Sequence, residues 1–436
     1  MENAFAALRE RIERRTAKLA VIGLGYVGLP MAIEFAGAGF KVTGIDNDRK
    51  RVALLNEGKT YILDVEESRI DAVAEKLSAT GDYSALINSD IVVICVPTPL
   101  RKTKDPDLSY ILSATSEIAR HVHKGQLVIL ESTTYPGTTE EIILPELRST
   151  GLKIGFDFFL AFSPERIDPG NPVYTIKNTP KIVGGVTSSC GDLTALLYGA
   201  IVENVVKVSS ARSAEMVKLL ENTFRAINIG MVNEVAIMCD KLGIDTWEVI
   251  DAAATKPFGF MPFYPGPGLG GHCIPIDPHY LSWKLKTLNY SAKFIELAGE
   301  INAGMPHYVV GKITDALNDA GKSVNGSRIL LLGVAYKKDS NDVRESPALD
   351  IWKLLIEKKG NVLYHDPYIA SVPVDSQVLE SRILDAALLQ GMDCTVIVTD
   401  HSSFDWQYVV DHSQLIVDTR NATRKVRSAH CRIVKL

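Results

Sequence analysis

The sequence predicts an α/β protein in which two doubly wound parallel sheets are joined by a long central helix and a helical dimerisation region. Three observations support this fold class. Short apolar runs alternate with helical patterns near the start, the same alternation returns after residue 328, and residues 212–242 form one helical pattern without proline. Alternating strands and helices are typical of parallel sheets, because each parallel connection needs a crossover. We therefore expect two Rossmann-like domains separated by a helical region.

The composition of the 436-residue chain is that of a globular protein, with 46% hydrophobic residues, 23% charged residues and a net charge of −5. The absence of a long basic run argues against nucleic acid or a membrane surface as a partner. The uncharged run 19–33 is too short to span a bilayer, and the first 17 residues lack the apolar core of a signal peptide. The six cysteines form no CxxC pair, so we expect a reducing, cytoplasmic compartment.

A glycine pattern follows the first apolar strand, with Gly23, Gly25 and Gly28 at the start of a helix. Such glycines allow a tight turn, close approach of the backbone to a pyrophosphate, and close packing of helix on strand. The next strand ends at Asp46, at the distance where a carboxylate recognises a ribose. Because Asp46 and the nearby Asp48 would repel a 2′-phosphate, the pattern predicts NAD rather than NADP.

Three further apolar strands are followed by polar residues: Thr98, then Ser132 and Thr133, then Glu165. Ligands of doubly wound sheets bind at the carboxyl ends of the strands, so these hydroxyls are expected to face the cofactor. Turn or capping chemistry is the commoner explanation for a lone threonine. A carboxylate in a proline-flanked loop can act as a general base, but the neighbouring Arg166 favours a surface ion pair with Glu165.

The helical pattern 212–242 is roughly 45 Å long, which is enough to connect two lobes. Lys218, Asn222 and Arg225 share one face of it. This face is either directed into a cleft or a solvated stripe, and the stripe is the commoner arrangement. The apolar face of the helix must be buried under a lobe or in a homodimer.

Residues 265–279 form a run rich in glycine and proline that surrounds one thiol, Cys273, with Asp277 one turn later. Glycine admits a ligand close to the backbone and proline fixes the chain path, as a nucleophilic thiol requires. An ordinary turn with a packed cysteine fits the run equally well. No metal is expected at His272, Cys273 and His279, since no further ligands accompany them.

The last hundred residues repeat the strand and helix order of the front, but the first turn after Gly333 lacks the second and third glycines. A second dinucleotide is therefore not expected there. Lys337, Lys338 and Arg344 offer positive charge for a phosphorylated substrate. An exposed basic loop is the alternative interpretation.

Taken together, the motifs resemble those of the UDP-glucose/GDP-mannose dehydrogenase family over nearly the whole chain. The matching runs are Gly23-Leu-Gly-Tyr-Val-Gly, Val96-Pro-Thr-Pro, Glu131-Ser-Thr, Ser163-Pro-Glu, Lys218-Leu-Leu-Glu-Asn-Thr-Phe-Arg-Ala, Gly270-Gly-His-Cys and Tyr336-Lys-Lys-Asp-Ser-Asn-Asp-Val-Arg-Glu-Ser. The resemblance implies an NAD-binding domain (1–210), a helical domain with the catalytic Cys loop (211–320) and a UDP-sugar domain (321–436). It also implies a homodimer or higher homo-oligomer that oxidises the C6 hydroxyl of a UDP-sugar to a carboxylate with two NAD⁺, for polysaccharide biosynthesis.

The resemblance assigns roles residue by residue. Catalytic roles fall on Cys273 as nucleophile and on Lys218, Asp277, Asn222, Glu165 and Thr133. Cofactor binding falls on Gly23, Gly25, Tyr26, Val27, Gly28, Asp46, Arg51, Thr98, Ser132, Thr133 and Arg344. Substrate binding falls on Glu165, Arg166, Lys218, Asn222, Tyr264, Gly270 and Lys337.

Substrate choice is expected to depend on positions that differ from the UDP-glucose branch. That branch carries basic residues where this chain has Pro257, Tyr264 and Ile276, and residues 257–268 look more like UDP-N-acetylglucosamine 6-dehydrogenases. UDP-N-acetylglucosamine is therefore the expected substrate, with UDP-glucose, UDP-N-acetylgalactosamine and UDP-N-acetylmannosamine as alternatives. A two-electron hydroxy-acid dehydrogenase or a non-catalytic nucleotide-binding protein would leave the Cys273 loop without a role.

Overall fold

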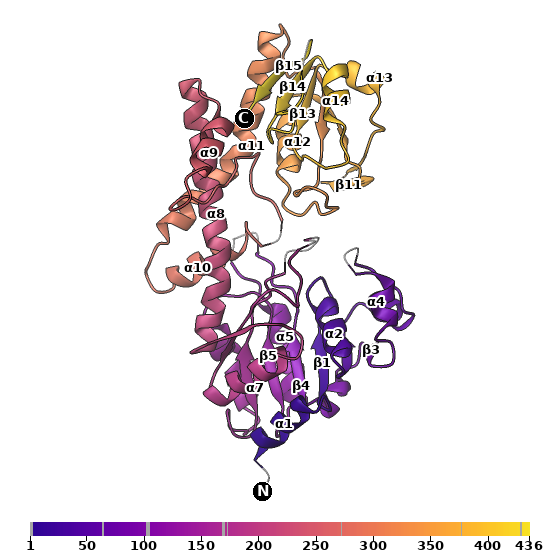
Figure 1. Ribbon diagram of the computed structural model, residues 1–436, viewed down its shortest axis with the longest axis vertical. Coiled ribbons are helices and arrows are strands. Elements are labelled where there is room, and N and C mark those ends of the chain that lie inside the picture. Colours follow the sequence, from indigo (N-terminus) through magenta and orange to yellow (C-terminus); the bar gives the residue numbers. More distant parts are fainter. Residues whose placement is uncertain are drawn as a thin grey trace. The chain divides into compact units, whose positions relative to one another are not determined.

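The computed structural model describes residues 3–62, 65–101, 105–167, 171, 173–271, 273–375, 377–427 and 430–436 (Figure 1). The chain forms two compact units, one of residues 1–221 and 279–290 and one of residues 222–278 and 291–436. Each unit is built around one of the two predicted sheets. Among the described helices, none combines the length and apolar content needed to cross a bilayer.

Within its described residues, the first unit contains an eight-stranded sheet in the order β3-β2-β1-β4-β5-β6-β7-β8. Its strands are β1 (Lys18–Ile22), β2 (Lys41–Ile45), β3 (Leu77–Thr80), β4 (Ile91–Ile94), β5 (Leu127–Leu130), β6 (Phe159–Phe162), β7 (Lys181–Gly185) and β8 (Val205–Val208). Strands β6 and β7 are antiparallel, whereas the other described neighbours are parallel. The sheet is therefore mixed, and β7 starts at the edge where β6 ends.

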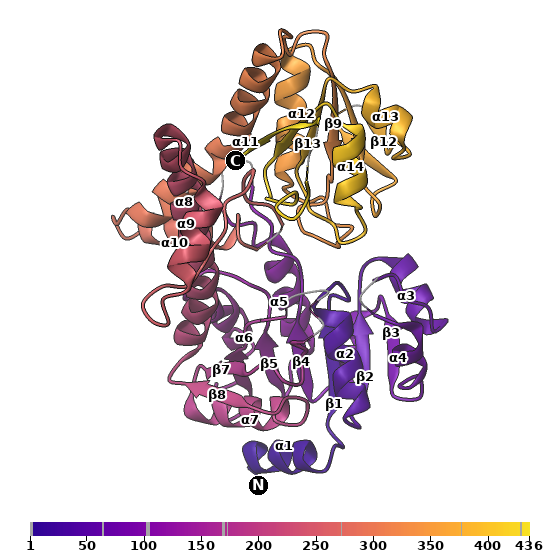
Figure 2. The same ribbon diagram turned by 45° about the horizontal axis from the view of Figure 1, so that its top comes forward.

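Side chains of these strands alternate between two cores, because successive residues of a strand point to opposite faces. The helices of this unit are α1 (Ala4–Glu13), α2 (Gly28–Gly37), α3 (Arg49–Asn56), α4 (Glu67–Asp71), η1 (Tyr83–Asn88), α5 (Ser109–His121), η2 (Thr139–Ile143), α6 (Leu144–Arg148) and α7 (Ser188–Tyr198), and α1 lies beside α7 (Figure 2). Leu19 and Val21 join the core with α1, α2 and α7, whereas Ala20 and Ile22 join the core with α5 and α6. Burial on both faces explains why the strands are continuously apolar in the sequence.

The second unit contains a parallel five-stranded sheet within its described residues, in the order β10-β9-β13-β14-β15, and a two-stranded hairpin. The strands are β9 (Arg328–Leu332), β10 (Asn361–His365), β13 (Cys394–Ile397), β14 (Leu415–Asp418) and β15 (Arg432–Lys435), and the hairpin is β11 (Ser371–Val374) with β12 (Gln377–Glu380). Ile329 and Leu331 pack with α11 (Lys293–Asp319) and α12 (Pro347–Glu357). Leu330 and Leu332 pack with α13 (Ala386–Gln390) and α14 (Trp406–His412) on the other face.

The predicted central helix is α8 (Ala211–Leu242), which begins in the first unit and ends in the second. Its interior glycine, Gly230, lies where α8 crosses α11. A Cβ atom at Gly230 would be 3.1 Å from the Cβ of Ala298, so the missing side chain lets the two helices approach. Two shorter helices, α9 (Thr246–Ala254) and α10 (Asp277–Lys286), follow α8 on either side of the thiol loop.

Candidate active site

The three glycines of the first turn have different surroundings, and these explain the motif. A Cβ at Gly23 would be 2.6 Å from the carbonyl oxygen of Cys95, and one at Gly28 would be 1.8 Å from the carbonyl oxygen of Gly23. Nothing in the protein lies within 4 Å of the position of a Cβ at Gly25. Gly23 and Gly28 are thus needed for packing, while Gly25 leaves backbone open to a ligand. The turn precedes α2, whose N-cap residue Val27 makes no side-chain cap, so the helix end is suited to a pyrophosphate.

The acid that follows β2 lies beside this turn. Asp46 accepts a hydrogen bond of 2.8 Å from the backbone N–H of Leu24, and the Arg51 guanidinium is 3.6 Å from its carboxylate. Arg51 also lies over the ring of Tyr61, 5.8 Å from its centroid. The structure therefore brings Asp46 and Arg51 together with the glycine turn, and the set fits the ribose and phosphate groups of a dinucleotide.

The polar residues at the strand ends have several different contacts. The Ser132 hydroxyl donates to the carbonyl of Val96 at 2.7 Å, which ties the end of β5 to the end of β4. The Thr98 carbonyl accepts a hydrogen bond from the Tyr280 hydroxyl. Thr133 is partly exposed at the same edge, after β5. The Ser132 hydroxyl is thus used in a contact between two strand ends, whereas Thr133 remains accessible to a ligand.

Glu165 is not in the surface ion pair that its neighbour suggested. The Arg166 guanidinium instead lies 2.7 Å from the carboxylate of Glu221 in α8. Glu165 is buried, with its Oε2 atom 3.4 Å from Nζ of Lys181. The sequence missed Lys181, because only the reversed direction of β7 brings this lysine to the edge where β6 ends.

Lys218 and Asn222 are buried at 9% and 6% relative exposure, so the interpretation of their helix face as a solvated stripe is wrong. Arg225, on the same face in the sequence, is exposed. The Asn222 amide donates a hydrogen bond to the carboxylate of Asp277, which is itself buried. The structure therefore brings together two predicted site residues that are 55 positions apart.

The thiol loop packs on the C-terminal sheet domain inside the second unit. The N–H of Gly271 donates to the carbonyl of Arg344 at 2.9 Å, and a Cβ at Gly270 would be 2.5 Å from the Cβ of Tyr336. Cys273 is exposed, and its carbonyl accepts the N–H of Asp277 at 2.8 Å, so one hydrogen-bonded turn joins this residue to the start of α10. His272, from the same motif, lies outside the described residues.

The turn after β9 is closed from within by hydrogen bonds to a carboxylate. Asp366 occupies the place that Asp46 has in the first sheet, and it accepts the N–H groups of Val334 and Ala335 at 2.8 and 2.9 Å. The buried His401 donates from Nε2 to the same carboxylate at 3.2 Å, because its Nδ1 accepts from the N–H of Asp339. Burial acts to raise the pKa of Asp366, but these hydrogen bonds hold it below the usual value.

The residues of the second unit that were predicted to bind ligands make different kinds of contact. Arg344 makes an ion pair of 2.6 Å with Asp342, and Lys337 is partly exposed in the same loop. Tyr264 stacks on Trp247 with ring centroids 5.7 Å apart, and its hydroxyl donates to Asp251 at 2.9 Å. Tyr264 is thus held against α9 by two contacts.

One cation near the thiol loop was missed in the sequence. Arg420 follows β14, and its Nε donates to the carbonyl of Val398 at 2.9 Å. A Cβ at Gly266 would be 2.5 Å from the Nη1 atom of Arg420, so the guanidinium lies directly against the start of the thiol loop. Burial lowers the pKa of this guanidinium, as expected for a cation held away from water. A cation at the carboxyl end of a strand can bind an anionic ligand. In the sequence, the Asp-Thr-Arg run directly after an apolar strand was the feature that could have indicated this cation.

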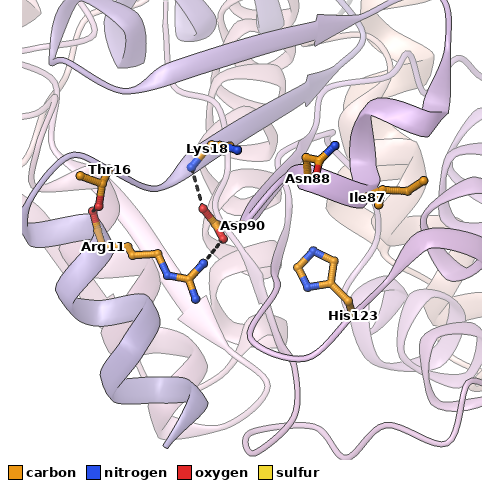
Figure 3. Close-up of a pocket in the computed structure, with 7 residues that line it drawn as sticks. All are labelled: Arg11, Thr16, Lys18, Ile87, Asn88, Asp90 and His123. Atoms are coloured by element: carbon orange, nitrogen blue, oxygen red, sulfur yellow. Dashed lines mark hydrogen bonds and ion pairs between the residues drawn. The ribbon is translucent and has the colours of Figure 1, made fainter. Parts of the chain in front are cut away.

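A pocket at the opposite edge of the first sheet is a separate feature. It is lined by Arg11, Thr16, Lys18, Ile87, Asn88, Asp90 and His123 (Figure 3). Asp90 accepts hydrogen bonds from the N–H of Lys18, at 2.8 Å, and from the Arg11 guanidinium. These residues precede or begin their strands, whereas the glycine turn follows β1. Within the described residues, we find no group of three His, Cys, Asp or Glu side chains placed to hold a metal ion.

Three successive parts of one family's sequence pattern match this chain. The NAD binding domain of the UDP-glucose/GDP-mannose dehydrogenase family matches residues 17–202, its central domain matches residues 212–304, and its UDP binding domain matches residues 330–425. The chain belongs to the UDP-glucose/GDP-mannose dehydrogenase family. It is therefore an NAD-dependent nucleotide-sugar dehydrogenase, and the glycine turn lies in the NAD binding domain of the family.

Relatives within this family support the assignment over most of the chain. The chain is 39% identical to UDP-N-acetyl-D-glucosamine 6-dehydrogenase of Pseudomonas aeruginosa over 81% of its length and 83% of the relative. It is 36% identical to UDP-N-acetyl-D-mannosamine dehydrogenase of Pyrococcus horikoshii over 94% of its length and 96% of the relative. The solved structure of the UDP-D-ManNAc dehydrogenase from Pyrococcus horikoshii superimposes with a TM-score of 0.88, covering 96% of this chain and 98% of that one at 35% identity. In this family, the residues Lys218, Asn222, Cys273 and Asp277 fall within the central domain.

Proposed function

We propose that this enzyme oxidises the C6 hydroxyl of UDP-N-acetylglucosamine to a carboxylate, with Cys273 holding the sugar between two oxidations. The observation that carries the proposal is the position of Cys273. It is exposed, it lies one turn before the start of α10, and the carboxylate of Asp277 at that start is bound by Asn222. An exposed thiol is accessible to a substrate, as a nucleophile requires.

NAD, when bound at the glycine turn, supplies the hydride acceptor for both oxidations. The first oxidation leaves an aldehyde at C6, and the Cys273 sulfur then adds to that carbon to form a thiohemiacetal. Loss of a second hydride from this tetrahedral carbon forms a thioester. Water breaks the carbon–sulfur bond, releases the carboxylate and returns the thiolate. One sugar, two NAD⁺ and one water thus become one uronate, two NADH and three protons.

The neighbouring residues are assigned roles that suit their chemistry. Lys218 and Asn222 donate hydrogen bonds to the C6 oxygen when it carries negative charge. Asp277 is held in place by Asn222 and exchanges protons near the sulfur. Glu165 and Thr133 orient the water that hydrolyses the thioester. On the substrate side, Lys337, Arg420 and Gly270 contact the diphosphate and the sugar.

Two kinds of relative bear on the identity of the sugar. Relatives named for N-acetylglucosamine and for N-acetylmannosamine are similarly identical to this chain, at 39% and 36%. Residues 257–268 favour the N-acetylglucosamine enzyme, and UDP-N-acetyl-D-mannosamine is the second candidate because that relative covers more of the chain. Production of the uronate for polysaccharide synthesis is the corresponding biological role.

The test is the yield and rate of NADH across UDP-glucose and the UDP-linked N-acetyl derivatives of glucosamine, galactosamine and mannosamine. We expect two NADH per sugar consumed and the highest kcat/KM with UDP-N-acetylglucosamine. One NADH per sugar would identify a two-electron dehydrogenase and remove Cys273 from the reaction. A higher kcat/KM with UDP-N-acetylmannosamine would replace the sugar but keep the chemistry.

We also propose that the enzyme is a homodimer that uses α8. Phe224, Met231, Met238 and Leu242 are exposed apolar residues of this helix, spaced by seven, seven and four positions. This spacing places them on one face, as in helices that pack against each other between chains. A second copy of the chain presents the same stripe, so the two can pack symmetrically.

The domain division and the compartment complete the proposal. We propose functional domains at 1–210, 211–320 and 321–436, with α8 at the start of the second domain. The six cysteines are free thiols, four of them buried, which supports a cytoplasmic location.

A further inference from the structure

Lys181 is a buried lysine in the first unit that neither the sequence motifs nor the proposed mechanism uses. It is the first residue of β7 and is 4% exposed. In the antiparallel pair of β6 and β7, Phe162 faces Gly184 and Ala161 faces Gly185. The same register continued by three residues places Glu165 opposite Lys181. The reversed direction of β7 therefore brings a cation to the edge of the sheet at which β6 ends.

The ammonium group of Lys181 is shared by two carboxylates. Its Nζ atom pairs with Oε1 of Glu131, which follows β5, and lies 3.4 Å from Oε2 of Glu165. Oε2 of Glu131 accepts from the Tyr198 hydroxyl at 3.2 Å and lies 3.7 Å from the Cys95 sulfur. These four residues are the titratable groups that face Lys181 from β5, β6, α7 and β4.

The electrostatics of this cluster keep Lys181 charged. Burial acts to raise the pKa of Glu131, and the charge of Lys181 acts to lower it. Burial acts to lower the pKa of Lys181, but the carboxylates of Glu131 and Glu165 raise it by more. One ammonium group thus pairs with two carboxylates, and a stronger ion pair with one of them leaves a weaker ion pair for the other.

Three contacts from the described residues orient the carboxylate of Glu165. Its Oε1 atom accepts the backbone N–H groups of Arg166 and Ile167 at 2.7 and 2.6 Å, while Lys181 takes one position at Oε2. An ionised carboxylate offers about four acceptor positions. The contacts of the described residues therefore fix the orientation of the group and leave about one position, on Oε2, for a water molecule.

We propose that Lys181 is the positioning residue of Glu165 and that Glu131 tunes it by competing for the same ammonium group. This inference rests on the proposed function, in which Glu165 orients the hydrolytic water. Lys181 pairs with Oε2 of Glu165 and aims the remaining acceptor position of this carboxylate at that water. Glu131 does not contact the reacting atoms, but its own ion pair with Lys181 determines how strongly Lys181 pairs with Glu165.

Two substitutions should move the pH dependence of catalysis in opposite directions. The measurement is kcat for NADH formation from UDP-N-acetylglucosamine between pH 5 and pH 9. In Lys181→Met, loss of the cation beside Glu165 should move the acid limb upward by about 1 pH unit or more. In Glu131→Gln, loss of the competing charge should move the same limb downward. Lys181→Arg, which keeps the charge, should leave the limb near that of the native chain.

Matched variants exclude a merely structural explanation. Glu165→Gln should remove the acid limb, which assigns the limb to Glu165. Should Lys181→Met fail to fold, Glu131→Gln decides alone, because it keeps the size of the side chain and the pair of Lys181 with Glu165. A limb that stays in place or moves upward in Glu131→Gln overturns the inference. A native chain that forms no NADH from any UDP-sugar overturns the proposed function and the inference with it.

Discussion

The side-chain amide of Asn222 donates a hydrogen bond to the carboxylate of Asp277. Asn222 is in α8, whereas Asp277 begins α10 and donates its own backbone N–H to the carbonyl of Cys273 at 2.8 Å. Both side chains are buried, at 6% and 2% exposure, so water competes little for the contact. This relationship links the central helix directly to the turn that presents the nucleophile.

Replacement of Asn222 by Leu should lower kcat by about 10²- to 10³-fold, which is the usual cost of removing one donor to a developing oxyanion. Because the amide also orients Asp277, KM for the UDP-sugar should change much less than kcat. Steady-state NADH formation measures both constants. Arg225→Ala is the matched control, since Arg225 is exposed three positions later on the same helix, and it should stay within about twofold of native. Equal losses in the two variants would remove the special role of Asn222.

Replacement of Cys273 by Ala should abolish uronate formation while NAD⁺ binding is kept, because the glycine turn is in the other unit. The product is measured by mass spectrometry and binding by calorimetry. Cys431→Ala, at the partly exposed cysteine, should have native activity. Iodoacetamide should modify Cys273 first, because it is the one exposed cysteine of the six. Normal uronate production by Cys273→Ala would contradict the thioester mechanism.

The local parts of the site were predictable from the sequence, and the non-local parts were not. Gly23, Gly25 and Gly28 form a pattern within one turn, so their roles follow from chain geometry alone. The spacing of Lys218 and Asn222 indicated a shared face, but their burial depends on contacts such as that with Asp277, 55 residues away.

The roles of Lys181 and Arg420 in the site were also not predictable from the sequence. The position of Lys181 depends on the direction of β7, and an apolar run has no signal for whether its strand is parallel or antiparallel. Arg420 reaches the thiol loop only because β14 and that loop meet in the folded second unit. The fold class could be predicted from repeated patterns in the sequence, whereas contacts between residues on different strands could be identified only in the structure.

Gly25→Ala and Gly28→Ala should separate ligand binding from folding. A methyl group at Gly28 would be 1.8 Å from the carbonyl oxygen of Gly23, so this variant should lose about 1–3 kcal/mol of stability or more. A methyl group at Gly25 meets nothing within 4 Å, so the folded protein should keep its thermal midpoint. Its NAD⁺ dissociation constant should rise about tenfold or more, because the methyl group enters the space of the pyrophosphate. Thermal unfolding and calorimetry measure the two effects, and unchanged NAD⁺ affinity in Gly25→Ala would place the cofactor elsewhere.

The free energy of unfolding should fall as the pH rises above 5, because Glu215 is buried in the folded protein. This buried carboxyl accepts the N–H and hydroxyl of Thr139 at 2.9 and 2.7 Å, but burial outweighs these bonds and raises its pKa from 4.5 to about 7. A raised folded-state pKa means that the folded chain binds the proton more tightly than the unfolded chain. The contribution of Glu215 to the free energy of unfolding is therefore fully present below pH 4.5 and is lost as the pH rises through 7. This contribution amounts to roughly 3 kcal/mol.

The check on Glu215 is the thermal midpoint at pH 5, 6, 7 and 8. Glu215→Gln cannot ionise, so its midpoint should vary less with pH than that of the native chain. Glu146→Gln removes an exposed carboxyl from the nearby helix α6 and should leave the native slope in place. Identical slopes in Glu215→Gln and the native chain would show that Glu215 is ionised throughout this range.

Substitution of the apolar stripe on α8 should dissociate the proposed dimer. In Met231→Lys and Met238→Lys, a charge enters a face that a second copy must bury, which should raise the dimer dissociation constant by at least about 30-fold at each position. Light scattering after gel filtration measures the change. Arg225→Glu lies about a third of a turn from the stripe, so it should leave the assembly intact although it reverses a charge. An assembly unaffected by the double variant Met231→Lys/Met238→Lys would exclude this stripe as the interface, since two unpaired lysines cannot be buried between chains without loss of affinity.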